Sequence, residues 1–189
     1  MADMPLGEPL RAQLRDVTKD AHARLDGLMG DGMQDRDQYG AYLRGMHCFV
    51  RSLSPSVEAQ QHALGWTIAD WEDALAADLQ ALGAGALASE TLPARDRDGA
   101  LGALYVVEGS ALGARLLVRQ ARALGYSAER GAAFLHAHAE GDHGQRWPRF
   151  LALLAGPRDN AARHAACDAA LDTFALAERC FRRAKGELK

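Results

Sequence analysis

Apolar residues recur at every third or fourth position through most of this chain, which is the spacing of helices with one buried face. The first segment with this spacing runs from Pro9 to Leu28, and the glycines that follow it predict its end. Its apolar positions are Leu10, Leu14, Val17, Ala21, Leu25 and Leu28. Strand-like alternation of apolar and polar residues is absent. The pattern therefore predicts an all-α fold.

Capping residues refine the next predicted helices. A helix is expected over 36–53, with Asp35 as its N-cap. A separate helix is expected to start at Ser54-Pro55, because serine caps helices and proline suits the first turn. The stretch from Thr67 to Asp70 has a capping-box pattern and predicts a helix that continues to Leu82.

The second half of the chain continues in the same way. Ser127 is a candidate N-cap for a helix over 128–139. Further helices are expected over 98–124, over 146–154 and from the Gly156-Pro157 turn to about residue 184, and an irregular loop is expected over 83–96. These elements predict one all-α domain spanning residues 1–189, with roughly seven to nine helices.

Composition and charge narrow the class of protein. Alanine and leucine are frequent, and both favour helices. The formal net charge of −3 argues against nucleic-acid binding, which needs a basic surface. The N-terminal residues lack the apolar segment of a secretion signal, and no run approaches the ~20 apolar residues of a membrane span. We expect a cytoplasmic protein that binds neither membranes nor nucleic acids.

The three cysteines, Cys48, Cys167 and Cys180, are far apart in the sequence and form no Cys-x-x-Cys pair. Neither a zinc site nor a framework of disulfides is therefore predicted. Free thiols agree with a reducing cytoplasm.

The first helix carries a candidate metal ligand. Thr18, His22 and Asp26 recur at four-residue intervals and so share one face, at the edge of the apolar stripe. His22 could bind a metal while Asp26 accepts a hydrogen bond from the other ring nitrogen, an arrangement that fixes the tautomer. A half-buried histidine with a partner on the helix surface would give the same spacing, and on this helix alone that explanation is preferred.

The segment from Tyr105 to Leu117 (YVVEGSALGARLL) reads as helix but carries two glycines. Each glycine costs about 1 kcal/mol relative to alanine in a helix interior. With Gly102, the pair Gly109 and Gly113 forms a stripe without side chains along one face. Such a stripe lets a partner helix or a flat ligand approach the backbone closely, and spacing alone does not choose between them.

Two later segments contain further candidates. The histidines and acids between 136 and 143 include one Glu-x-x-His unit, but a di-iron site needs a second such unit, which is missing. We expect this cluster to be a solvated helix end. Arg146 and Arg149 flank Trp147 and could bind carboxylates of an aromatic ligand, or they could be surface arginines beside core aromatics.

Taken together, two of these segments resemble one known family. The helix from Leu14 to Asp26 (LRDVTKDAHARLD), followed about eighty residues later by the Glu-Gly-Ser-x-Leu-Gly motif of 108–113, is similar to the haem oxygenases. The bacterial branch that supplies biliverdin to bacteriophytochromes looks closest, and the similarity extends to the late segment that begins at Trp147.

The resemblance implies a helical bundle with haem between a proximal and a distal helix. His22 would be the proximal iron ligand, oriented by Asp26, and Thr18 would lie beside it. Arg15 would pair with one haem propionate. Arg146 or Arg149 would pair with the other.

On the distal side, the resemblance implies that Gly109 and Gly113 bring the helix backbone over the haem, with Tyr105 one turn earlier. These glycines and Ser110 would form the catalytic face. Mammalian members carry an aspartate where Ser110 stands, and it organises a water network there. The proton-delivery network of this chain must therefore be built differently.

The reaction implied is oxidative cleavage of haem b, at once cofactor and substrate, to biliverdin, CO and ferrous iron. It needs O₂ and electrons from an external donor, either a ferredoxin or a flavin reductase, and a bacteriophytochrome could receive the biliverdin. A non-enzymatic haem carrier with the same pocket is the alternative function. A helical module of thiaminase-like architecture or a pure interaction role is a third.

Overall fold

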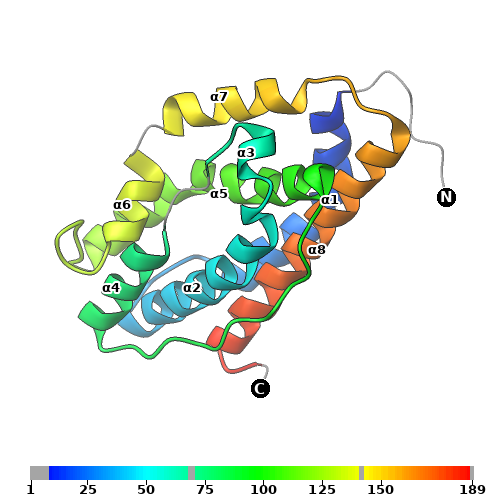
Figure 1. Ribbon diagram of the computed structural model, residues 1–189. Coiled ribbons are helices and arrows are strands. Elements are labelled where there is room, and N and C mark those ends of the chain that lie inside the picture. Colours follow the sequence, from blue (N-terminus) through cyan, green and yellow to red (C-terminus); the bar gives the residue numbers. More distant parts are fainter. Residues whose placement is uncertain (1–8, 68–70, 141–142, 188–189) are drawn as a thin grey trace.

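The computed structural model describes residues 9–67, 71–140 and 143–187, and within these ranges it contains eight helices and no strand. Figure 1 shows them in chain order. They are α1 (Leu10–Met29), α2 (Arg36–Glu58), α3 (Gln61–Leu64), α4 (Glu72–Leu82), α5 (Arg97–Ala123), α6 (Ala133–Glu140), α7 (His143–Leu154) and α8 (Asn160–Ala184). The all-α prediction is confirmed.

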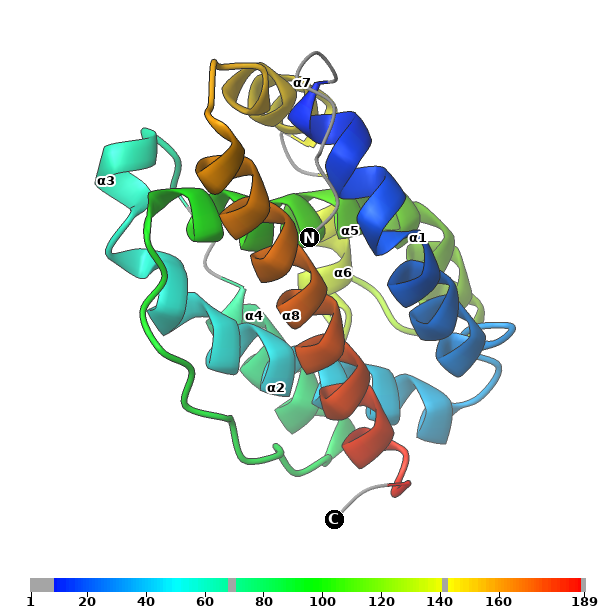
Figure 2. The same cartoon turned by 90° about the vertical axis from the view of Figure 1, so that its right-hand side faces the viewer.

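Helix α5 lies at the centre of the bundle and contacts α8, α6, α7 and α2. Helix α1 packs along α8, as Figure 2 shows, and α2 contacts α8 as well. Helix α7 lies across one end of the bundle, between α6 and the start of α8 (Figure 1). The buried apolar side chains of these helices form one continuous cluster, with Tyr39, Phe134 and Phe150 fully buried.

Several predicted boundaries agree with the structure. Asp35 accepts a hydrogen bond from the Gln38 backbone N–H at 2.8 Å and caps α2, as expected. The segment 83–96 is an irregular loop, and it runs along the outside of the bundle from α4 to α5 (Figure 1). The proposed capping box before α4 includes residues 68–70, which lie outside the described residues.

The expected break at Ser54-Pro55 is wrong, because α2 continues through Pro55 to Glu58. A proline inside a helix removes one backbone hydrogen bond. The residues that follow it, Ser56 and Val57, are buried in the core, and this packing holds the last turn in helical form. Tertiary burial therefore overrides the local start signal.

The predicted start of the helix after Ser127 is also wrong. Ser127 donates its hydroxyl to Glu129, and α6 begins only at Ala133. Its first N–H groups, on Ala133 and Phe134, each donate to the Asp78 carboxylate of α4 at 2.9 Å. The cap comes from a residue that is distant in sequence, so local pattern could not find it.

Helix α5 has the length and apolarity of a membrane-spanning helix, with a mean hydropathy of 1.4 over its most apolar window. The expectation that no segment has the length and apolarity of a membrane span was therefore too strict. Just over half of that window is buried against other helices, as the core helix of a bundle would be. The apolar length of α5 thus has an explanation in the bundle itself.

Candidate functional site

A cavity of about 1100 Å³ opens between α1 and α5. Helix α1 forms one wall and the second half of α5 forms the opposite wall, while Met46 and Phe49 of α2 and Phe174, Ala177 and Phe181 of α8 contribute apolar side chains. The volume lies just above the range of about 300–1,000 Å³ for sites of small molecules and cofactors. The cavity is large enough for a flat macrocycle.

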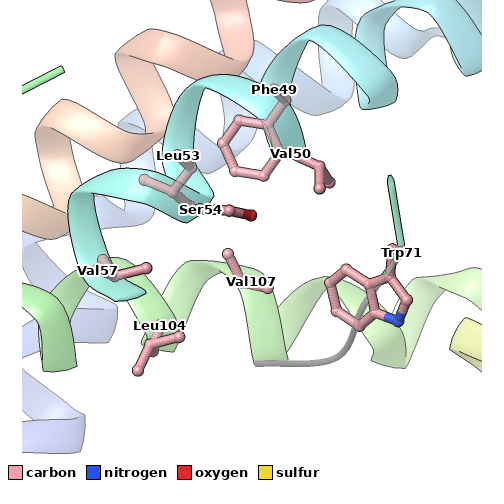
Figure 3. A pocket seen from close by; sticks show the side chains of 8 residues that line it. All are labelled: Phe49, Val50, Leu53, Ser54, Val57, Trp71, Leu104 and Val107. Carbon is pink, nitrogen blue, oxygen red and sulfur yellow. The ribbon is translucent and has the colours of Figure 1, made fainter. Parts of the chain in front are cut away.

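A second, much smaller gap lies between α2 and α5, and Figure 3 shows the eight side chains that surround it. Its volume is about 10 Å³, close to that of a single water probe. Its walls are almost entirely apolar, and they include Leu53, Val57 and Leu104. We interpret it as an imperfection of core packing and place the candidate site in the larger cavity.

The α1 wall presents His22 to the cavity. The His22 Nδ1 atom lies 2.8 Å from Asp26 Oδ2, and both side chains are well exposed. Phe174 of α8 contacts the imidazole edge-on, with ring centroids 5.7 Å apart. Because Asp26 engages Nδ1, the Nε2 atom is the one left to bind a metal.

Thr18, one turn before His22, is buried and also lines the cavity. Its hydroxyl donates to the Leu14 carbonyl at 2.7 Å, within the same helix. Thr18 therefore offers its methyl group and the lone pairs of its hydroxyl oxygen to a ligand. It does not offer a free donor.

The α5 wall contains a strip of bare backbone at Gly109 and Gly113. A Cβ at Gly113 would meet no atom within 4 Å, so it would project into open space. A Cβ at Gly109 would lie 3.7 Å from the Trp147 ring, which is ordinary contact. Leu112 and Leu116 flank this strip on the cavity and are 64% and 56% exposed. Apolar surface of this kind is typical of a binding site.

Ser110 and His138 provide a polar contact on this wall. The Ser110 Oγ atom lies 3.1 Å from His138 Nε2 and donates to the Val107 carbonyl at 2.7 Å. The imidazole stacks on Phe134 and meets Trp71 edge-on. Both Ser110 and His138 line the cavity.

Basic and aromatic side chains lie near one end of the cavity. Arg15 and Lys19 line it from α1, and the Arg15 side chain is 73% exposed beside Asp16, 3.1 Å away. Tyr105 lines the α5 side, and burial raises the pKa of its phenol, with Arg11 and Arg15 opposing the shift. These cations could receive the acidic groups of a ligand.

A family model described as heme oxygenase matches residues 58–183, about two thirds of the chain. The chain belongs to the haem oxygenase family. Heme oxygenase PigA of Pseudomonas aeruginosa is 32% identical over 162 residues, 78% of each protein. A heme oxygenase of Xanthomonas campestris is 30% identical over 140 residues, 72% of this chain and 84% of the relative.

The fold has a matching solved structure, the NO- and CO-bound heme oxygenase of Neisseria meningitidis. The TM-score is 0.72 at 24% identity, over 94% of this chain and 92% of the other. The match to the family model begins after α1, so His22 and Asp26 lie outside it. In this haem oxygenase homologue, the case for His22 as a ligand and Asp26 as its partner therefore rests on the geometry of the cavity.

The structure does not bring Arg146 and Arg149 to the cavity wall. Arg146 instead forms a two-pronged pair with Glu108 of α5, at 2.8 and 2.6 Å, and its guanidinium lies over Trp66. Glu108 is only 2% exposed and also accepts from the Trp66 indole at 2.9 Å. Arg146 is therefore the partner of a buried carboxylate.

Sequence reasoning also missed two cavity residues. Lys19 lies one position after Thr18 and reaches the cavity beside Arg15. His138 belongs to the cluster that was expected to be a solvated helix end, and this expectation is wrong for it, since it is 2% exposed. A histidine two positions from His136 gave no periodic signal that would place it in the interior.

Proposed function

We propose that this chain binds haem in the cavity between α1 and α5 and cleaves it oxidatively to biliverdin, CO and ferrous iron. One observation carries the proposal: an imidazole with an engaged Nδ1 faces a bare stretch of helix backbone across a large apolar cavity. Membership of the haem oxygenase family supports the same function.

The residues present fit a haem. A flat, largely apolar macrocycle needs a wide cavity with aromatic and aliphatic walls, and Phe49, Phe174 and Phe181 supply part of them. The acidic propionates need cations at one edge. We keep Arg15 for one propionate and assign Lys19 to the other in place of Arg146 or Arg149, because Arg15 and Lys19 line the cavity.

His22 would hold the iron through Nε2, and Asp26 would keep the imidazole in the correct tautomer and orientation. Thr18 and Phe174 would restrict the ring from its two sides. When bound, haem supplies the reactivity toward O₂, and electrons come from an external donor. We propose a ferredoxin or a flavin reductase for that role.

On the opposite wall, Gly109 and Gly113 would let the backbone of α5 approach the haem without an intervening side chain. A Cβ at Gly113 would meet no atom within 4 Å, so this position leaves open space in the cavity. The two glycines would thereby keep room beside the macrocycle for O₂, with which the bound haem would react.

Ser110 and His138 would supply the polar contact that the family aspartate provides in mammalian members. The Ser110 hydroxyl is hydrogen-bonded at both ends, to the Val107 carbonyl and to His138, so its orientation is set. A fixed hydroxyl beside the glycine strip could order water in this part of the cavity. We further propose that the biliverdin passes to a bacteriophytochrome.

Titration with haemin tests the proposal. A Soret band and a green tetrapyrrole product under O₂, with ascorbate or a reductase, are the expected results. Haem that binds and survives unchanged would favour the alternative function of a haem carrier. Chromatography of the product would establish the activity and the carbon that is attacked.

Replacing the proposed ligand is the sharpest single change. In His22→Ala, the fold should be retained because the side chain is exposed and its partner Asp26 lies one turn on in the same helix. Turnover should fall by at least a hundredfold, and the Soret spectrum should lose its imidazole signature. Asp26→Asn is the graded control, with a smaller loss. Normal turnover in His22→Ala would show that another residue binds the iron.

A further inference from the structure

Two cysteines that are distant in sequence meet between α2 and α8. The Sγ atoms of Cys48 and Cys180 lie 3.0 Å apart, with Cys180 donating its S–H, and both residues are fully buried. Both thiols are free in the structure, as is Cys167, which also belongs to α8. A dithiol pair at this separation needs only a small movement to reach the S–S bond length of about 2.05 Å.

The surroundings of the pair make one sulfur acidic. The hydrogen bond from Cys180 lowers the pKa of Cys48 to about 7, and the Arg183 guanidinium and Ser52 act in the same direction. Arg183 Nη1 lies 3.7 Å from Cys48 Sγ. The same contact raises the pKa of Cys180, while burial raises that of Cys167 to about 11. Burial and the Glu90 carboxylate oppose the lowering of the Cys48 pKa, so near neutral pH this thiol is partly ionised while Cys180 keeps its proton.

The irregular loop over 83–96 contacts Cys48. The protonated Cys48 thiol donates to the Ala88 carbonyl at 3.4 Å, and the same carbonyl accepts from Arg183 at 3.1 Å. Ala88 itself is exposed. Arg179 pairs with Glu90 of the same loop at 2.8 Å. A loop held by a few polar contacts opens more readily than the helices beneath it, which gives a small oxidant a route.

We propose that Cys48 and Cys180 are a reversible thiol–disulfide modification site, at which a hydroperoxide crosslinks α2 to α8. The Cys48 thiolate attacks one peroxide oxygen, so an S–O bond forms, the O–O bond breaks and hydroxide leaves. The Cys180 sulfur then attacks the sulfenic sulfur, forming S–S, and the released hydroxyl departs as water with the thiol proton. In sum, two thiols are oxidised and one hydrogen peroxide is reduced to two waters.

The crosslink would bear on the cavity because the same two helices line it. Met46 and Phe49 of α2 and Ala177 and Phe181 of α8 are cavity residues, within a turn of the two cysteines. A covalent bond between the helices would fix their spacing at this point. The site itself needs neither haem nor turnover, so it can be tested in the protein alone.

The test is thiol mapping of the reduced full-length protein after treatment with hydrogen peroxide. Free thiols are then alkylated in denaturant, and the digested protein is analysed by mass spectrometry. We expect a mass loss of about 2 Da before alkylation, a Cys48–Cys180 crosslinked peptide, full alkylation of Cys167, and reversal by a dithiol. An unchanged content of three alkylated thiols, or crosslinks that involve Cys167, would overturn the proposal.

Variants separate the roles of the residues. Cys167→Ser should still form the crosslink, whereas Cys180→Ser should stop at a sulfenic acid on Cys48 that dimedone captures. The oxidation rate of the natural sequence should rise with pH through about 7, as Cys48 ionises. Arg183→Gln should move this midpoint upward. Arg179→Gln, which loosens the same loop by breaking the pair with Glu90, should leave the midpoint unchanged. Equal midpoints in both variants would show that Arg183 does not influence the Cys48 thiol.

Discussion

Gly102 in the first half of α5 and Gly113 in the second half face different neighbours. A Cβ at Gly102 would lie 1.9 Å from the carbonyl oxygen of Ala166, so the backbones of α5 and α8 meet there directly. A Cβ at Gly113 would meet nothing within 4 Å and borders the cavity. The first glycine serves helix packing and the second leaves room for a ligand, although both belong to one helix.

Glu108 lies between these two halves and is a buried charge. Its carboxylate is held by Arg146 of α7 and by the Trp66 indole. This pair ties α7 to the point where α5 changes from packing helix to cavity wall. Removing the pair of Glu108 and Arg146 therefore tests the junction between the two halves of α5.

Arg146→Ala should have the largest effect on stability. It leaves a carboxylate that is 2% exposed without its cation, and breaking a buried pair in this way typically costs about 3–5 kcal/mol. Urea unfolding followed by circular dichroism measures the loss. Arg149→Ala, an exposed arginine three positions on, is the matched control and should cost at most about 1 kcal/mol, since an exposed charged contact contributes no more than that. Equal losses would contradict the role of Arg146.

Gly102→Ala should come next, at about 3 kcal/mol. The added methyl group would overlap the Ala166 backbone, and a close backbone contact cannot relax by a rotamer change. Gly113→Ala is the matched control on the same helix. Its methyl group enters open space and gains helix propensity, so this variant should be more stable by about 0.5–1 kcal/mol. If both substitutions changed stability alike, the two halves of α5 would not differ as described.

Gly113→Leu tests the cavity half through binding. The larger side chain would occupy the open space that we assign to haem, so haemin affinity should fall at least tenfold, or about 1.4 kcal/mol. Folding stability should not fall, since leucine is a better helix former than glycine. Haemin titration and thermal unfolding of the same preparation measure the two quantities. Unchanged affinity would place the ligand elsewhere.

Ser110→Ala should have the smallest effect. The change removes one hydrogen bond to His138, which costs roughly 1 kcal/mol when a buried partner loses its contact. The rate of biliverdin formation should fall by more than haemin affinity does, because the hydroxyl is proposed to order water beside the glycine strip. Parallel losses of rate and affinity would reduce Ser110 to a structural residue.

The sequence predicted most helices and half of the candidate site from local regularities. The pairing of His22 with Asp26 follows from a four-residue spacing on one helix, so it could be read directly, and the structure places the two atoms 2.8 Å apart. The bare strip at Gly109 and Gly113 could be located in the same way. Whether another helix fills the space beside that strip could not be predicted, because it depends on where α7 and α8 lie.

Residues that act across the bundle escaped the sequence for a physical reason. Asp78 caps α6 from another helix, and His138 meets Trp71, which is distant in the sequence, edge-on. The aromatic residues next to Arg146 in the sequence suggested a partner for a haem propionate. In the structure, Arg146 instead pairs with Glu108. Each of these contacts joins distant segments, and neither spacing nor residue type records the distance between them.

The sequence by itself determined where helices form, which faces are apolar, and that His22 and a glycine strip are available. These properties depend on interactions within a few residues along one helix. The tertiary structure decided that Gly102 meets α8 while Gly113 meets open space, and that Lys19 and His138 reach the cavity. It did so because helix packing sets the distances between segments, and those distances decide whether a missing side chain makes a contact or leaves a cavity.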